Sequence, residues 1–180
     1  MAYTPIERDS VPQPCITLVG MAGAGKSTLG EKLAARLGWG QLDTDRYLES
    51  YYALPLQEIM DSYGLDEFLR IEGVLVSELN LTRTIISTGG SVIYDEAAMA
   101  RLKTLGPVVL LDIDEETFIE RVGNAENRGL AIGPGKTMRD LYIERQPLYR
   151  AAADIVVSTD TNTPDECVDQ ILKQIDFDVE

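Results

Sequence analysis

The sequence of 180 residues contains no histidine, and this absence excludes several kinds of active site. A Ser-His-Asp triad, a histidine general base and a histidine-bearing metal site all depend on an imidazole group. The two cysteines, Cys15 and Cys167, form no CxxC pair. We expect each to be a small free thiol, in the core or on the surface, in a reducing compartment.

Basic residues are scarce, with 16 Lys and Arg against 30 Asp and Glu, and the formal net charge is −14. Binding to nucleic acid depends on a dense basic surface, so we expect no nucleic-acid partner. An anionic small-molecule substrate would have to be held by a few cations that lie close together. Nothing in the sequence suggests an obligate oligomer, and we expect a monomer.

Long apolar runs are also absent, and no stretch is long enough to cross a bilayer. Residues 1–14 contain three prolines and lack the apolar region of a signal peptide. We predict a loosely ordered lead-in there, followed by one domain over residues 15–180, in a cytoplasmic protein with no membrane contact. A domain of this size buries roughly 70% of the surface of its unfolded chain, so its core needs no disulfide or metal.

Short β-rich runs alternate with helical patterns along this domain. A helix is predicted over residues 26–37, and strands over 16–19, 85–87, 108–112 and 155–157, with another strand before Asp43. This alternation predicts an α/β fold, in which helices cover both faces of a parallel sheet. Residues 123–137 are instead rich in glycine and polar residues, which indicates a loop that could act as a lid.

The strongest motif is GMAGAGKST, residues 20–28, which fits GxxxxGK[ST] between a predicted strand and a predicted helix. Glycines in such a loop let backbone N–H groups surround phosphate oxygens, and the helix N-terminus favours their negative charge. Lys26 is expected to reach the β and γ phosphates, and the Ser27 hydroxyl to bind Mg²⁺. The sequence therefore predicts a nucleoside triphosphate site formed by Gly23, Ala24, Gly25, Lys26, Ser27 and Thr28.

Polar residues and glycines follow two other predicted strands. Asp43 and Asp45 could point one toward the metal and one toward an acceptor hydroxyl if the segment is extended, or could simply cap a helix. Gly89 and Gly90, in STGGSV, could let the backbone lie close to a ligand or could form an ordinary tight turn.

Six segments in this order resemble the shikimate kinases: GMAGAGKST, LDTDRYLE, EFLRIE, STGGS, NRGL and ERQPLYR, between Cys15 and about Lys173. The resemblance implies a compact P-loop kinase with a five-stranded parallel sheet, substrate-binding helices and a mobile lid. Such a kinase transfers phosphate from ATP, with Mg²⁺, to the hydroxyl of a small carboxylate.

The resemblance also implies roles for individual residues. Asp43 would lie near the metal, and Asp45 near the acceptor hydroxyl as its base. The backbone of Gly89 and Gly90 would border the substrate. Of the arginines, each of which could in isolation be a solvated surface residue, Arg128 would close over the transferring phosphoryl group, Arg121 would lie near the nucleotide, and Arg145 would grip the substrate carboxylate.

The chain departs from the family pattern in three places. A glycine triplet is replaced by GGS at residues 89–91, and the lid sequence RPL by RGL at residues 128–130. The third departure lies in the pattern F-R-x-x-E, where Phe68 and Glu72 are the anchors and Leu69 occupies the arginine position. In shikimate kinases that arginine shares the substrate carboxylate, and its loss would cost on the order of 2 to 3 kcal/mol.

A leucine at position 69 favours an acceptor that carries a carboxylate, a hydroxyl and also an ammonium group, which a second guanidinium would repel. Homoserine has all three, and we predict a homoserine kinase that forms O-phosphohomoserine for threonine biosynthesis. The alternative is an authentic shikimate kinase, which forms shikimate 3-phosphate for chorismate and aromatic amino-acid biosynthesis. It would require Arg70 to compensate, although neighbouring helical side chains diverge by about 100°, or another cation.

Other readings of the nucleotide site are less consistent with the sequence. A nucleotide-binding module without catalysis would not need Asp45, Arg128 and Arg145 together. A GTPase is not expected, because residues 162–165 read NTPD and lack the lysine of an NKxD motif. Asp112 ends a run typical of a Walker B strand, but the resemblance assigns the metal side to Asp43, so Asp112 is expected to end a strand or cap a helix.

Overall fold

Five strands form one parallel sheet in residues 14–123 and 130–175, which are the residues that the computed structural model describes. Their order across the sheet is β2-β3-β1-β4-β5, so that β1 lies between β3 and β4. The strands are β1 (Ile16–Val19), β2 (Gly40–Asp43), β3 (Thr84–Ser87), β4 (Val108–Asp112) and β5 (Ile155–Ser158).

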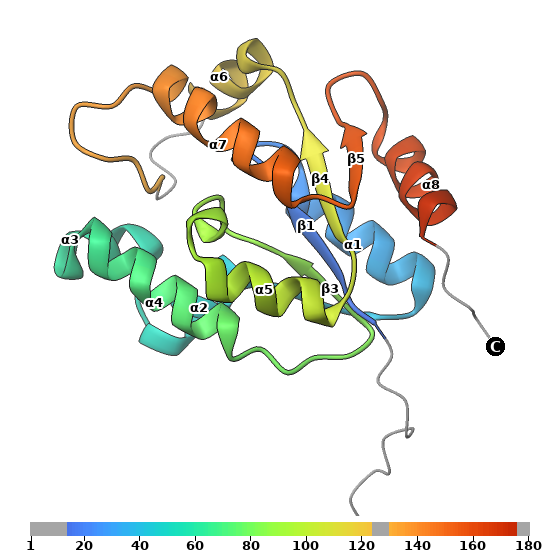
Figure 1. The fold of residues 1–180 in the computed structure, drawn as a ribbon, viewed down its shortest axis with the longest axis horizontal. Helices are drawn as coiled ribbons and strands as arrows, with labels where there is room; N and C mark the ends of the chain where they lie inside the picture. Colours follow the sequence, from blue (N-terminus) through green and yellow to red (C-terminus); the bar gives the residue numbers. More distant parts are fainter. Residues whose placement is uncertain (1–13, 124–129, 176–180) are drawn as a thin grey trace, which may run out of the picture.

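Helices cover both faces of the sheet (Figure 1). They are α1 (Lys26–Leu37), α2 (Thr44–Tyr52), α3 (Leu56–Tyr63), α4 (Leu65–Ser77), α5 (Glu96–Leu105), α6 (Glu115–Gly123), α7 (Met138–Ala152), α8 (Pro164–Gln174) and the short 3₁₀ helix η1 (Val92–Tyr94). α1 packs against β3 and α8, whereas α5 and α7 lie on the opposite face. β1 and β3 are therefore buried along their whole length.

A second, smaller core lies beside the main one and holds α2, α3 and α4 together. Its buried side chains are Leu48, Ile59, Phe68, Ile71 and Ala131. Leu69 packs against this cluster from α4 and is half-buried. Ala131 comes from a distant part of the chain, so the segment that precedes α7 is tied to the helices beside the sheet.

The structure confirms the predicted α/β class and the parallel five-stranded sheet. The predicted bounds agree for β1, β4 and α1, and β3 and β5 are each one residue longer than predicted. The extended segment suggested for both aspartates is wrong, because β2 ends at Asp43 and α2 begins at Thr44. Most of the lead-in and residues 124–129 of the predicted lid lie outside the described residues.

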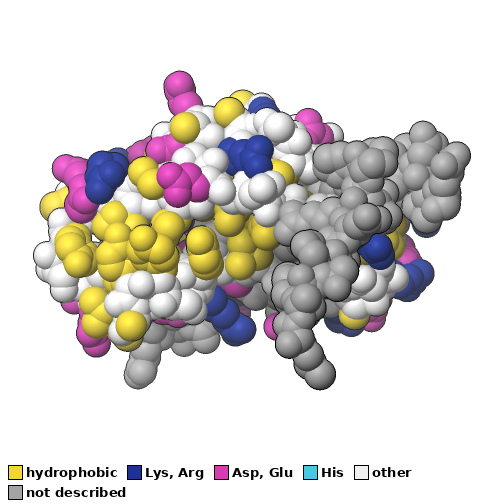
Figure 2. Space-filling model, turned by 90° about the horizontal axis from the view of Figure 1, so that it is seen from below, with side chains coloured by type: hydrophobic (Ala, Val, Ile, Leu, Met, Phe, Trp, Pro, Cys, Tyr) yellow, Lys and Arg dark blue, Asp and Glu magenta, His cyan; other side chains and the backbone are white. Residues whose placement is uncertain are grey.

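The surface carries no single continuous basic area on the described part of the face in Figure 2, where Lys and Arg side chains lie in separate small groups. Hydrophobic and acidic side chains share that face. Within the described ranges, no helix is long and apolar enough to span a membrane. Cys15 and Cys167 are both free and buried.

Candidate active site

The loop from Gly20 to Gly25 joins the end of β1 to the start of α1, at the carboxyl edge of the sheet. Gly23 and Gly25 have φ values of 77° and 90°. This left-handed region is costly for residues with a Cβ, which explains the glycines of the motif. The loop therefore places backbone N–H groups around the N-terminus of α1, where an anion is stabilised.

Lys26 folds back over its own loop. Its Nζ donates hydrogen bonds to the carbonyl oxygens of Gly20 and Met21, both at 2.8 Å. Desolvation lowers the pKa of Lys26 to about 8, although the nearby charges of Asp45 and Asp43 oppose this shift. The ammonium group is thus held at the mouth of the loop, where the phosphates of a nucleotide would lie.

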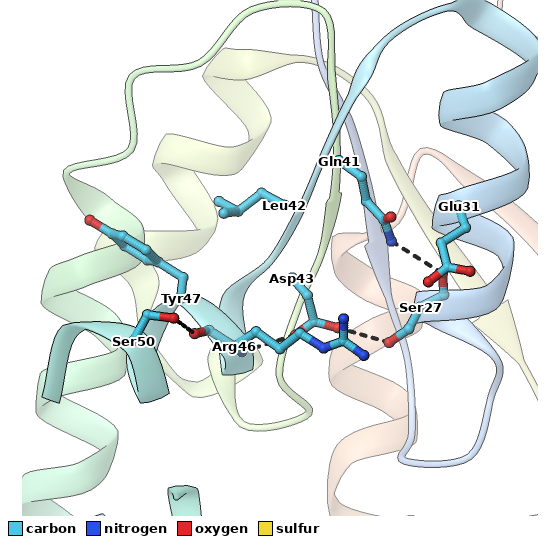
Figure 3. Close-up of a pocket in the computed structure, with 8 residues that line it drawn as sticks. All are labelled: Ser27, Glu31, Gln41, Leu42, Asp43, Arg46, Tyr47 and Ser50. Atoms are coloured by element: carbon cyan, nitrogen blue, oxygen red, sulfur yellow. Dashed lines mark hydrogen bonds between the residues drawn. The ribbon is translucent and has the colours of Figure 1, made fainter. Parts of the chain in front are cut away.

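Ser27 and Asp43 meet beside this loop. The Ser27 hydroxyl donates to Oδ2 of Asp43 at 2.8 Å, and Oδ1 of Asp43 accepts the backbone N–H groups of Asp45 and Arg46. Asp43 therefore does cap α2, as one interpretation of the sequence suggested, and the cap fixes its carboxylate next to Ser27. Figure 3 shows both side chains in a pocket of about 310 Å³, which Arg46 also lines.

These two side chains fit Mg²⁺. The ion prefers oxygen ligands in an octahedral arrangement and usually keeps several waters and phosphate oxygens. In the described part of the chain, no group of three or more His, Cys, Asp and Glu side chains could hold a metal by itself. Ser27 and Asp43 would therefore share the ion with a nucleotide and water.

Asp45 lines a second cavity, of about 80 Å³. Lys26 and Arg145 line the same cavity, together with Phe68, Gly90 and Ala131 among others. Burial and the neighbouring charge of Asp43 raise the pKa of Asp45 to about 6. A carboxylate with such a pKa can accept a proton near neutral pH more readily than an ordinary aspartate.

Glu72 is a second buried carboxyl near this cavity. It is 3% exposed, and its Oε2 accepts the Ser91 hydroxyl at 2.5 Å. Burial is the main cause that raises the pKa of Glu72, to about 7. Gly89 lies between the two acids, because a Cβ there would overlap both Glu72 Oε1 and Asp45 Oδ1. The serine that replaces a family glycine thus has a partner in Glu72.

Arg145 also lines this second cavity, which we call the acceptor cavity. It is only 2% exposed, so it is not a solvated surface residue. Its Nη2 donates to the Ala131 carbonyl at 2.5 Å, and its Nε donates to the Tyr94 hydroxyl at 3.0 Å. A Cβ on Gly90 would lie 3.0 Å from Nη1, so this glycine allows the guanidinium to approach. α7, which carries Arg145, starts with a capping box formed by Thr137 and Asp140.

Position 69 contributes no charge to this cavity. Leu69 packs against the second core instead. Arg70 faces outward with 63% of its side chain exposed, and its Nε and Nη2 donate to Glu67 at 2.8 and 2.6 Å. The divergence expected of neighbouring helical residues is therefore observed, and Arg70 does not replace the missing guanidinium in this structure.

Three of the remaining predicted residues lie in the described part of the chain. Arg121 donates to the Gly23 carbonyl at 3.0 Å and to the Thr159 carbonyl at 3.2 Å, which ties α6 to the loop. Thr28 is exposed on the first turn of α1. Asp112 ends β4, as expected, and pairs with Arg150. Arg128 lies outside the described residues.

Comparison with known proteins agrees with this geometry. Residues 22–176 match the family model described as "Shikimate kinase". The chain belongs to the shikimate kinase family. A shikimate kinase from Chromohalobacter salexigens is 37% identical over 164 residues, which cover 89% of this chain and 91% of that protein. One from Aromatoleum aromaticum is 37% identical over 163 residues, with 89% and 93% covered.

Solved structures of the family have the same fold. The shikimate kinase of Acinetobacter baumannii in complex with shikimate has a TM-score of 0.77 at 30% identity, covering 89% of this chain and 92% of that one. The enzyme of Aquifex aeolicus has a TM-score of 0.75 at 31% identity, with 89% and 95% covered. The chain is therefore an ATP-dependent small-molecule kinase. The homoserine prediction finds no support in these comparisons, which favour the shikimate alternative.

Tyr94 and Tyr149 also belong to this site, although the sequence did not indicate them. Tyr94 follows the STGGS segment in a short 3₁₀ helix and contacts Arg145, while the Tyr149 hydroxyl donates to the Gly90 carbonyl. Both contacts join residues that are 51 or more positions apart. No local pattern marks such long-range partners.

Proposed function

We propose that the chain transfers the γ-phosphate of ATP to a hydroxyl group of a small carboxylate, and that shikimate is its acceptor. The observation that carries this proposal is the small cavity that Lys26, Asp45 and Arg145 share. It lies directly beside the phosphate-binding loop, and it offers one base and one guanidinium to a compact substrate. The membership of the family supports shikimate as the acceptor.

In the proposed reaction, Gly23 to Thr28 would hold the phosphates of ATP. Ser27 and Asp43 would hold Mg²⁺, which would supply positive charge beside the phosphates. Asp45 accepts the hydroxyl proton of the substrate while the new bond to the γ-phosphorus forms and the bond to the β-phosphate oxygen breaks. Lys26 stabilises the charge that develops on the transferred group. Arg145 holds the carboxylate and thereby orients the hydroxyl. We also propose that Arg121 lies near the nucleotide and Arg128 near the phosphoryl group, and that the protein is a cytoplasmic monomer.

Homoserine is a second candidate acceptor, because of the charges around the cavity. Leu69 is apolar, Arg70 is paired with Glu67, and Glu72 has no ion-pair partner among the described residues. A buried carboxylate without a cation would attract the ammonium group of an amino-acid substrate. On this reading Glu72 would take the ammonium, and Arg145 the carboxylate.

The test is ADP release by the purified protein with ATP and Mg²⁺, measured side by side with shikimate and homoserine. We expect a higher kcat/KM for shikimate, and the identity of the product is checked by mass spectrometry. Asp45→Asn serves as the control, since it keeps the shape of the site but removes the base. A higher kcat/KM for homoserine would replace shikimate with the second candidate, and ADP release that neither acceptor stimulates would refute both.

A further inference from the structure

Arg145 differs from other paired arginines of this chain in the partners that surround it. Arg70 and Arg150 each pair with a carboxylate, Glu67 and Asp112. Among the described residues, Arg145 has instead a carbonyl oxygen and the phenols of Tyr94 and Tyr149 as its hydrogen-bond partners. Its guanidinium carbon lies 5.0 Å from the centre of the Tyr94 ring. These partners are neutral, so they orient the guanidinium without cancelling the charge that a substrate carboxylate needs.

The direction of the hydrogen bonds at Tyr94 is fixed by Glu144. The Tyr94 hydroxyl donates to Glu144 Oε1 at 2.7 Å, and Lys136 pairs with the other oxygen of the same carboxylate. Because the phenolic hydrogen is used there, the oxygen turns a lone pair toward Nε of Arg145, which lies at 3.0 Å. Without this acceptor the hydroxyl could rotate and point its hydrogen at the guanidinium.

The same network joins both ends of the segment 131–136 to Arg145. Ala131 holds Nη2 directly, and Lys136, five residues further along, acts through Glu144 and Tyr94. The guanidinium is thus held at Nη2, at Nε and against the aromatic ring, and Nη1 remains beside Gly90 at the wall of the cavity. A group held in this way loses little conformational freedom when it binds a carboxylate.

We propose that Tyr94 is a positioning residue, which orients Arg145 toward the acceptor carboxylate, and that Glu144 and Lys136 set the direction of its hydroxyl. This inference rests on the proposed function, because it concerns the same acceptor site. It matters more here than in a site with two arginines, since Leu69 offers no second guanidinium. Tyr94 does not touch the reacting atoms and therefore acts through affinity for the acceptor.

The test compares Tyr94→Phe with Tyr142→Phe as the matched control. Tyr142 lies on α7, as Arg145 does, but its hydroxyl donates to the Ile113 carbonyl. With whichever of shikimate and homoserine the wild type phosphorylates, we expect the acceptor KM of Tyr94→Phe to rise about tenfold, while kcat and the KM for ATP stay within about twofold. The control should leave all three constants unchanged.

A double-mutant cycle separates positioning from a merely structural role. In an Arg145→Lys background the guanidinium that the phenol orients is gone, so Tyr94→Phe should add almost nothing to the acceptor KM. If Tyr94→Phe does not fold, Glu144→Ala carries the test, because it removes the acceptor of the Tyr94 hydroxyl. We expect the acceptor KM of this variant to increase about threefold. Equal KM values for Tyr94→Phe and Tyr142→Phe, or an undiminished effect in the Arg145→Lys background, would overturn the inference.

These outcomes are distinct from a failure of the proposed function. Absence of wild-type turnover with both acceptors would refute that function, and this inference with it. Wild-type turnover combined with an unchanged acceptor KM in Tyr94→Phe and Glu144→Ala would refute the inference alone.

Discussion

Substituting Leu69 by arginine tests whether this position selects the acceptor. Leu69 is half-buried on α4, at the place where the family pattern has an arginine, and no described cation other than Lys26 and Arg145 lines the acceptor cavity. A second charge-assisted clamp on a carboxylate is worth about 1.5 to 3 kcal/mol, which corresponds to a factor of about 10 to 100 in affinity. For shikimate we expect a gain in affinity at the lower end of this range, because the new arginine side chain must also leave the apolar cluster against which Leu69 packs.

The same variant should act in the opposite direction on homoserine. A new guanidinium would repel the ammonium group and pair with Glu72, so kcat/KM for homoserine should fall several-fold, by about 1 kcal/mol or more. The quantity to measure is the ratio of kcat/KM for shikimate to that for homoserine, from ADP release with saturating ATP. It should rise at least about tenfold over the wild type.

Leu75→Arg is the matched control. Leu75 packs on the same cluster from the same helix and is half-buried like Leu69. The control therefore introduces the same charge and a similar loss of packing, of about 1 to 3 kcal/mol, which thermal unfolding can compare. A ratio that stays at the wild-type value in Leu69→Arg, or that rises equally in Leu75→Arg, would show that position 69 does not select the substrate.

Three further predictions concern neighbouring charges. Arg70→Ala should leave kcat/KM for both acceptors within about twofold, because the side chain pairs with Glu67 in solvent; a large loss in an acceptor assay would mean that Arg70 reaches the substrate. Because Asp45 must be deprotonated to act as base and burial raises its pKa to about 6, kcat should increase with pH through that value and then level off, and a flat profile from pH 5 to 8 would contradict this role. The pKa of Glu72 is raised to about 7 from an unfolded value near 4.3. Between these two pH values the folded state binds a proton that the unfolded state has lost. The free energy of unfolding should therefore fall as the pH rises through this window. Glu72→Gln should remove part of that slope in thermal unfolding, whereas an unchanged slope would exclude Glu72 as its source.

Features that depend on near neighbours in sequence were determined by the sequence itself. The P-loop, the strand β1 before it and the helix α1 after it agree with the prediction because glycines, apolar runs and helical spacing act within a few residues. The order of six family segments also identified the family. The sequence indicated even the divergence of Leu69 and Arg70, since it follows from the geometry of a helix.

The family resemblance suggested Asp45, Gly90 and Arg145 for the acceptor site, but only the tertiary structure decided which other side chains surround them in the acceptor cavity. Asp45 lines it from the first turn of α2, which begins at Thr44 after the cap at Asp43. Tyr94 and Ala131 meet Arg145 across 51 and 14 residues of sequence, and Ser91 meets Glu72 across 19. Such contacts arise from the packing of distant elements, which residue spacing along the chain does not specify. They hold Arg145 in a position where it could bind a carboxylate.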